Sequence, residues 1–248
     1  MTDNAFTAFT RLDLARTALL LDVDGTLIDI GPSPFEVDVP QSLKDSLLRL
    51  LEKTAGALAL VSGRPIRDLD LLFAPLQLPA IGGHGAETRL HANEAPTRIA
   101  DLDPQLRREL VGAVAHNPDL EYEDKGYSVA LHFRKAPGEE QRLRSHVQQA
   151  LARFPGEKVE VLPGKAMIEV KRPGISKGQA VRALMQRQPF ARRMPVFIGD
   201  DVMDESVFAA MPELGGVNFS VSRQFGGVQH VFSAPAEVRR ALADLSAT

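Results

Sequence analysis

The sequence of 248 residues contains no cysteine, which excludes disulfide bonds, thiolate catalysis and zinc sites with cysteine ligands. It also has no strong excess of charge of either sign: 29 lysines and arginines oppose 32 aspartates and glutamates, a formal net charge of −3. A nucleic-acid-binding surface needs a concentrated basic excess. This balance therefore gives no support for nucleic acid as a partner.

Long apolar runs are missing as well. No run approaches the roughly 20 residues that a membrane-spanning helix needs. The segment 1–16 mixes polar and scattered apolar residues and lacks the apolar core of a signal peptide. We therefore expect a soluble, cytoplasmic protein without a membrane partner. Its content of 44% hydrophobic and 25% charged residues is typical of a globular chain, long enough for one large domain or two small ones.

Short apolar runs that end in Gly, Asp or Ser turns alternate with helical patterns. The helical patterns lie at Ser42–Glu52 and Gly178–Gln186. Such alternation predicts an α/β fold with a doubly wound, Rossmann-like parallel sheet, whose ligands bind at the carboxyl ends of the strands. The apolar runs, read as strands, are Thr17–Leu21, Ala57–Val61, Pro79–Ile81, Pro195–Ile198 and Gly216–Phe219.

The middle of the chain, 101–173, has a different pattern, which predicts an α+β domain inserted into a core formed by 1–100 and 174–248. The strand expected at Tyr127–Phe133 alternates, with Val129, Leu131 and Phe133 on one face and Ser128, His132 and Arg134 on the other. Alternation of this kind predicts one face packed on helices and one face in water. The other expected elements are helices at Pro104–His116, capped by Asp103, and Glu139–Arg153, and a hairpin that pairs Lys158–Leu162 with Ala166–Val170 across Pro163-Gly164.

Two aspartates follow the first apolar run directly, in the stretch Asp22-Val23-Asp24-Gly25-Thr26. Side chains alternate along a strand, so residues 22 and 24 point the same way. Two carboxylates on one side repel each other unless a cation or proton lies between them. Aspartate oxygens suit Mg²⁺, and an aspartate can also attack phosphorus as a nucleophile. The alternative is a plain Asx/Gly turn.

Three further junctions place polar residues at strand ends. Ser62-Gly63-Arg64 offers a hydroxyl and backbone N–H groups to a phosphate, or a simple helix N-cap. Lys177 opens a helix, where its charge suits a phosphate or an aspartate, unless it is merely exposed. Asp200, Asp201, Asp204 and Glu205 form a second acidic cluster, which a metal would compensate.

These four pieces, in this order, resemble the haloacid dehalogenase superfamily of aspartyl-nucleophile phosphatases. The resemblance implies that Asp22 attacks the phosphoryl group and that Asp24 protonates the leaving oxygen and then activates water. It implies that Mg²⁺ is the cofactor, that Ser62 and Lys177 hold the phosphoryl oxygens, and that Gly25 and Thr26 contact substrate. The implied metal ligands are Asp22, the backbone carbonyl of Asp24, and Asp200, with Asp201 and Asp204 ordering the waters around the ion.

The inserted segment lies where sugar-phosphate phosphatases of this superfamily carry an α/β cap. Five stretches are similar to those of trehalose-6-phosphate phosphatases, with Met203 standing where that family usually has threonine. The resemblance implies a role in substrate binding for Arg64, Glu123, Lys125, Arg134, Lys165 and Glu169, and a functional link to a trehalose-phosphate synthase. The stretches are Ser62-Gly63-Arg64, Gly83-His84-Gly85-Ala86-Glu87, Glu123-Asp124-Lys125-Gly126 with Ser128, His132 and Arg134, Gly164-Lys165 with Glu169 and Pro173, and Gly199 to Glu205.

Other interpretations stay open at this point. A polar cap face also suits a phosphatase for a sucrose, mannosylglycerate or hexose phosphate. A phosphomutase shares the nucleophile but retains the phosphoryl group for a second transfer, and an inactive regulatory domain would keep only the fold. Glu123 and Lys125 alone could form an exposed ion pair in a turn, and His132 and Arg134 could orient the cap on the core.

Overall fold

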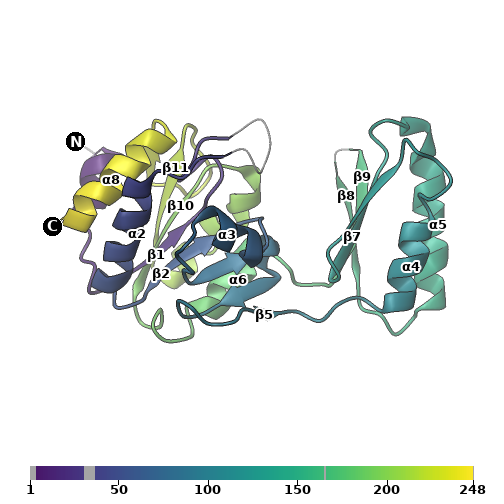
Figure 1. Ribbon diagram of the computed structural model, residues 1–248, viewed down its shortest axis with the longest axis horizontal. Helices are drawn as coiled ribbons and strands as arrows, with labels where there is room; N and C mark the ends of the chain where they lie inside the picture. Colours follow the sequence, from purple (N-terminus) through teal and green to yellow (C-terminus); the bar gives the residue numbers. More distant parts are fainter. Residues whose placement is uncertain (1–3, 31–36, 165, 248) are drawn as a thin grey trace. The chain divides into compact units, whose positions relative to one another are not determined.

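The computed structural model describes residues 4–30, 37–164 and 166–247, and the chain divides into two compact units (Figure 1). The core unit comprises 1–98 and 176–248, and the inserted unit comprises 99–175. The boundaries predicted from the sequence lie at 100/101 and 173/174. Within the described residues, no helix is both long enough and apolar enough to cross a membrane.

The core unit is built on an eight-stranded sheet in the order β12-β11-β10-β1-β2-β3-β4-β5. The pairs from β12 to β3 are parallel, and the two pairs from β3 to β5 are antiparallel. The predicted α/β class with a mainly parallel sheet is therefore confirmed. The strands are β1 (Thr17–Leu21), β2 (Leu58–Val61), β3 (Ala80–Gly82), β4 (Glu87–Arg89), β5 (Thr97–Arg98), β10 (Met194–Gly199), β11 (Val217–Val221) and β12 (His230–Phe232).

Helices cover both faces of this sheet, which explains why β1 is a continuous apolar run. Leu19 and Leu21 join a hydrophobic cluster with α1, α2, α3 and α8, whereas Ala18 and Leu20 join a second cluster with α6 and α7. Successive side chains thus enter opposite layers. The helices are α1 (Ala5–Thr10), α2 (Gln41–Lys53), α3 (Ile66–Leu72), α6 (Lys177–Leu184), α7 (Glu205–Phe208) and α8 (Pro235–Ala247).

The inserted unit is a four-stranded antiparallel sheet in the order β6-β7-β9-β8, with α4 and α5 packed on one face. Val129 and Leu131 of β7 and Ile168 and Val170 of β9 are fully buried against these helices, as the alternation predicts. The elements are α4 (Pro104–Gly112), β6 (Glu121–Asp124), β7 (Ser128–His132), α5 (Glu140–Arg153), β8 (Glu160–Gly164) and β9 (Met167–Lys171).

Helix α4 is shorter than predicted. Helix α4 begins at its predicted cap, where the Asp103 carboxylate accepts from the backbone N–H of Gln105 at 2.7 Å. It ends at Gly112 instead of His116, because glycine favours helix termination and the following N–H groups bond three residues back.

The hairpin prediction was wrong in its register. Pro163 pairs with Ile168, and Gly164 pairs with Met167, so both expected turn residues belong to β8. Proline is tolerated there because β8 is an edge strand, where a missing N–H breaks no ladder bond. The connection consists of residues 165 and 166, of which 165 lies outside the described residues.

The prediction that Ser128 lies on a face in water was wrong. Ser128 is only 2% exposed, because its short side chain lies on a central strand beside the longer side chain of Lys171. Arg134 is exposed and His132 is half-buried. The sheet face away from α4 and α5 is therefore polar in part only.

Candidate active site

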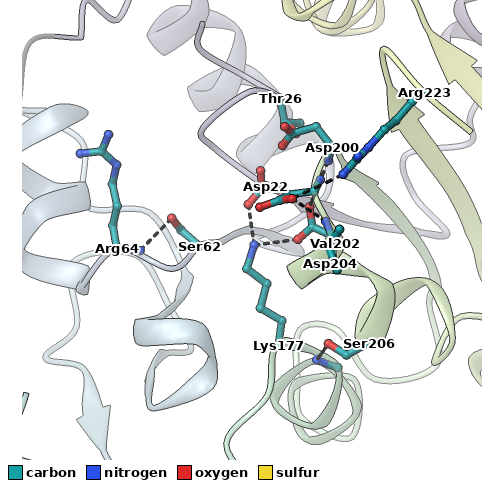
Figure 2. Close-up of polar contacts among 12 residues, drawn as sticks. Asp22, Thr26, Ser62, Arg64, Lys177, Asp200, Val202, Asp204, Ser206 and Arg223 are labelled. Carbon is teal, nitrogen blue, oxygen red and sulfur yellow. Dashed lines mark hydrogen bonds and ion pairs between the residues drawn. The ribbon is translucent and has the colours of Figure 1, made fainter. Parts of the chain in front are cut away.

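Polar side chains meet where three neighbouring parallel strands end. The register aligns Leu21 at the end of β1 with Leu60 of β2 on one side and with Ile198 of β10 on the other. Asp22, which follows β1, is therefore flanked by the turn after β2 and the acidic segment after β10. Figure 2 shows Asp22, Ser62, Lys177 and Asp200 around this edge.

Lys177 is the first residue of α6, and its ammonium lies between two buried aspartates. Its Nζ donates to Oδ1 of Asp22 and to Oδ1 of Asp204, each at 2.7 Å. Burial by itself lowers the pKa of Lys177, but the charges of Asp22 and Asp204 outweigh it and raise the pKa above its usual value. The side chain is 6% exposed, so Lys177 is a buried, permanent cation and not a solvated lysine.

Asp22, Asp200 and Asp204 form a carboxylate cluster in which one oxygen of each lies within 4.8 Å of the others. Burial raises the pKa of Asp22 well above its usual value, and the charges of Asp204 and Asp200 add to this against the opposing effect of Lys177. Burial also raises the pKa of Asp200. One ammonium therefore leaves the negative charge of three carboxylates incompletely balanced.

Gly25 and Thr26, predicted as substrate contacts, both lie against Asp200. The Thr26 hydroxyl donates to Oδ1 of Asp200 at 3.1 Å. A Cβ on Gly25 would lie 2.1 Å from Oδ2 of Asp200, and the φ of +79° at this glycine also disfavours any other residue. These contacts orient Asp200, and the contact of either residue with substrate stays a prediction.

Asp204 anchors the acidic segment after β10. Its Oδ2 accepts from the backbone N–H groups of Asp200 and Asp201 at 3.0 and 3.2 Å, while its Oδ1 accepts from Lys177. Asp201 is exposed, lies outside this group and pairs with Arg223 at 3.4 Å. Sequence reasoning missed Arg223, because nothing near β11 marks it as a partner of an acid 22 residues earlier.

The donor set fits a hard divalent cation, since carboxylate oxygens are the ligands that such ions prefer. Both oxygens of Asp204 already accept hydrogen bonds from protein groups. Asp22 and Asp200 are therefore the carboxylates of the cluster best suited to bind a cation directly.

Asp24 forms a bidentate ion pair with Arg64, a contact that joins two of the predicted site residues. Nε of Arg64 donates to Oδ2 of Asp24 at 2.7 Å, and Nη2 donates to Oδ1 at 2.6 Å. The hydrogen bond to Asp24 raises the pKa of the Arg64 guanidinium. Both oxygens of Asp24 are thus engaged by Arg64.

Ser62 is buried and its Oγ accepts from the backbone N–H of Arg64 at 3.1 Å. This bond shapes the turn between β2 and α3, and the helix-capping alternative is not observed: the N-cap of α3 is Pro65, which makes no side-chain cap hydrogen bond. Ser62 and Arg64 are therefore held on one turn beside Asp22.

The remaining predicted residues lie in the inserted unit. Nζ of Lys125 lies 3.3 Å from Oε1 of Glu123. Ala130 of β7 is paired with Glu123 of β6 on one side and with Glu169 of β9 on the other, so the three residues form one row across the sheet. Arg134 is exposed just beyond β7, and Lys165 lies outside the described residues. The structure thus assembles two groups of predicted residues, one within each unit.

Comparisons with known proteins agree on one family. The trehalose-phosphatase family model matches residues 20–240. The trehalose-6-phosphate phosphatase of Escherichia coli K12 is 39% identical over 232 residues, which cover 88% of this chain and 85% of that protein. A probable trehalose-phosphate phosphatase of Sinorhizobium fredii is 39% identical over 226 residues, which cover 90% and 84%.

A solved structure of trehalose-6-phosphate phosphatase from Aspergillus fumigatus, in its crystal form 3, has the same fold. It superposes with a TM-score of 0.73 at 22% identity, covering 100% of this chain and 99% of that one. Together with the family match, this places the chain among enzymes that hydrolyse phosphoric monoesters on a haloacid dehalogenase fold. The chain belongs to the trehalose-phosphatase family.

Proposed function

We propose that this protein hydrolyses trehalose 6-phosphate to trehalose and phosphate, with Mg²⁺ as cofactor and an aspartyl-phosphate on Asp22 as intermediate. The observation that carries the proposal is the group formed by the buried Asp22, Lys177 and Asp204 and the half-buried Asp200 at one edge of the parallel sheet. Its chemistry suits phosphoryl transfer, which chiefly needs positioning and charge neutralisation. The E. coli relative supplies the choice of substrate.

In the first step, an oxygen of Asp22 attacks phosphorus, and the bond between phosphorus and the sugar oxygen breaks. Lys177 already donates to Asp22, so its ammonium lies where an attacked phosphoryl group would carry its charge. Ser62 is buried on the neighbouring turn, and its hydroxyl would hold a phosphoryl oxygen. Water then cleaves the aspartyl-phosphate and releases free phosphate.

Asp24 would give its proton to the leaving sugar oxygen and later take one from the attacking water. Both of its oxygens accept from Arg64 in the structure, so one must be released before it carries a proton. Arg64 would exchange Asp24 for the anionic phosphoryl group, because a guanidinium binds phosphate with the same two-donor geometry. This exchange gives Arg64 its place in substrate binding.

Mg²⁺ would be held by Asp22, Asp200 and the backbone carbonyl of Asp24, with Asp201 and Asp204 ordering its waters. Both oxygens of Asp204 accept hydrogen bonds from protein groups, which supports a role in ordering waters around the ion and not in binding it directly. When bound, Mg²⁺ neutralises phosphoryl charge and offsets the repulsion between Asp22 and the phosphate.

The inserted unit would bind the sugar that lies away from the phosphate. Strands of a sheet lie about 4.8 Å apart, so Glu123 and Glu169 are separated by about 10 Å with the small Ala130 between them. Two carboxylates at this spacing can accept from hydroxyls on opposite sides of a hexose ring. Lys125, Arg134 and Lys165 would add donors.

A panel of phosphate esters tests the proposal. We expect free phosphate from trehalose 6-phosphate with the highest kcat/KM, and none after EDTA treatment. A higher kcat/KM on sucrose 6-phosphate or a hexose phosphate would overturn the substrate assignment. Transfer of the phosphoryl group to a second sugar, without free phosphate, would identify a mutase. A beryllium fluoride adduct on Asp22 would support the covalent intermediate.

The proposed reaction also implies a supplier of trehalose 6-phosphate, so we propose a functional link to a trehalose-phosphate synthase. Copurification of the protein with such an enzyme, or loss of trehalose after deletion of either gene, would test this link. A cytoplasmic location is likewise proposed, and fractionation of cells tests it.

A further inference from the structure

The connection between β3 and β4 packs against the turn that carries Ser62 and Arg64. The backbone N–H of Gly83 donates to the carbonyl of Arg64 at 2.9 Å, and that of His84 donates to the carbonyl of Ser62 at 3.1 Å. Two carbonyls of the turn are therefore fixed by the backbone of a segment about 20 residues further along the chain.

The two segments pack so closely that no residue larger than glycine fits at Gly63 or Gly82 without a shift of its neighbours. A Cβ on Gly63 would lie 2.4 Å from Cε1 of His84, and a Cβ on Gly82 would lie 2.9 Å from the backbone nitrogen of Ile66. Both distances are shorter than any ordinary carbon contact. The position of the turn that carries Ser62 and Arg64 therefore depends on the position of the connection between β3 and β4.

Glu87, the first residue of β4, supplies a side-chain contact to the far end of the turn. Its Oε2 accepts from the backbone N–H of Ile66 at 2.7 Å. Ile66 is the first residue of α3, where a helix leaves its N–H groups without partners, and the N-cap Pro65 provides no side-chain bond. Glu87 therefore takes the place of the missing cap.

We propose that Glu87 is a positioning residue for phosphoryl transfer. By holding the start of α3, it keeps the preceding turn in the conformation in which Ser62 is buried beside Asp22 and Arg64 reaches Asp24. The inference rests on the proposed function, since Ser62, Arg64 and Asp24 are assigned to the reaction there. Glu87 would act through the backbone N–H of Ile66, which its carboxylate holds.

An ion pair between α3 and β4, separate from the hydrogen bond of Glu87, provides a matched control. Nη1 of Arg89 donates to Oδ2 of Asp70 at 2.9 Å, and Nη2 donates to Oδ1 at 2.5 Å. This contact links the same helix and strand but lies away from the turn. Asp70→Asn weakens the packing of α3 on β4 without changing what holds Ile66.

The test compares Glu87→Ala, Glu87→Gln and Asp70→Asn in the full chain. We expect Glu87→Ala to lower kcat by ~10- to 100-fold on both trehalose 6-phosphate and a small aryl phosphate, with a smaller change in KM, because slight misplacement of reacting groups is costly. Glu87→Gln should recover most of kcat, since an amide oxygen still accepts from Ile66. Asp70→Asn should lower the Tm but keep kcat.

Unchanged kcat in a folded Glu87→Ala protein would overturn the inference. Equal losses of kcat in Glu87→Ala and Asp70→Asn would also overturn it, because general packing would then explain both. If Glu87→Ala does not fold, Glu87→Asp replaces it, since the shorter side chain withdraws the carboxylate from Ile66. A fall in kcat in Glu87→Asp supports the inference, and an unchanged kcat overturns it.

A measurement without turnover separates this inference from the proposed function. The NMR signal of the Arg64 Nε–H, assigned with Arg64→Lys, reports the pairing of Arg64 with Asp24. A wild-type protein that releases no phosphate overturns the proposed function. Even then, a shifted Arg64 signal in Glu87→Ala supports the positioning role, and an unshifted signal refutes it.

Discussion

Replacing Asp22 by asparagine removes one negative charge from a cluster of three carboxylates and one ammonium, in which only Asp200 is half-buried and the others are buried. Turnover should stop, because the nucleophile is gone. The effect on stability should run the opposite way. An asparagine oxygen can still accept from Lys177, while the repulsion of the Asp22 charge by Asp200 and Asp204 disappears.

The expected gain in stability follows from the interactions of Asp22 with Lys177, Asp200 and Asp204. With an effective dielectric constant of about 20, two carboxylates about 5 Å apart repel by about 3 kcal/mol, and the pair of Asp22 with Lys177 at 2.7 Å attracts by about 6 kcal/mol. Repulsion by Asp200 and Asp204 therefore matches the attraction, and the desolvation of a residue only 4% exposed decides the balance. We expect Asp22→Asn to stabilise the metal-free protein by ~1–3 kcal/mol at neutral pH.

The pH dependence follows from the raised pKa of Asp22. Because the folded protein favours the protonated form, the free energy of unfolding of the wild type falls as pH rises above about 4, where the unfolded aspartate ionises. It levels off above the folded pKa. Asp22→Asn does not titrate here, so its advantage over the wild type should grow across this interval and vanish below it.

Urea unfolding in EDTA, repeated over this pH range, measures the difference. Asp70→Asn is the control, because it weakens an ordinary ion pair with the buried Arg89. It should lower the free energy of unfolding by about 2 kcal/mol. The charge argument is refuted if Asp22→Asn lowers the free energy of unfolding as much as Asp70→Asn does. It is also refuted if the difference in this free energy between Asp22→Asn and the wild type does not change with pH. Added Mg²⁺ should stabilise the wild type more than Asp22→Asn.

Three further outcomes are expected. Asp24→Asn should lower kcat by ~10²–10⁴-fold, the usual worth of general acid–base catalysis, with unchanged Mg²⁺ affinity by calorimetry; normal chemistry with lost Mg²⁺ binding would contradict the assignment. Asp200→Ala should raise the Mg²⁺ concentration needed for half-maximal rate, and full activity of the wild type in EDTA would sink the metal hypothesis. Glu123→Ala, Lys125→Ala and Glu169→Ala should lower kcat/KM on trehalose 6-phosphate far more than on a small aryl phosphate, since only the sugar makes those contacts; parallel losses on both substrates would point to a role in folding or chemistry.

The meeting of Asp22, Ser62, Lys177 and Asp200 could be predicted because it depends on local patterns and one rule of topology. Each of the strands before Asp22, Ser62 and Asp200 is a short apolar run, and parallel strands present their carboxyl ends at the same edge of a sheet. The register of β1 with β2 and β10 then brings the three junctions side by side. The burial of Lys177 follows from the acids that meet there.

The contacts that tune this site could not be predicted, because hydrogen bonds and ion pairs between residues distant in the sequence leave no sequence pattern. Arg64 meets Asp24 from 40 positions away, and Glu87 meets Ile66 from 21. Strand β6 was missed for a related reason. Its four residues, Glu121 to Asp124, are all exposed, so they show no alternation, and only pairing with β7 makes them a strand.

Both units carry carboxylates, and their different burial explains why we propose different chemistry for them. In the core unit, Asp22 and Asp204 are buried, so their charges need compensation, which the buried ammonium of Lys177 supplies and to which we propose that Mg²⁺ adds. In the inserted unit, the carboxylate of Glu123 is 55% exposed beside Lys125. Water already satisfies that charge, so a ligand that replaces water with hydroxyl groups can bind there without a compensating ion. A sugar phosphate offers both kinds of group, which is why we assign its phosphate to the core unit and its remote hydroxyls to the inserted one.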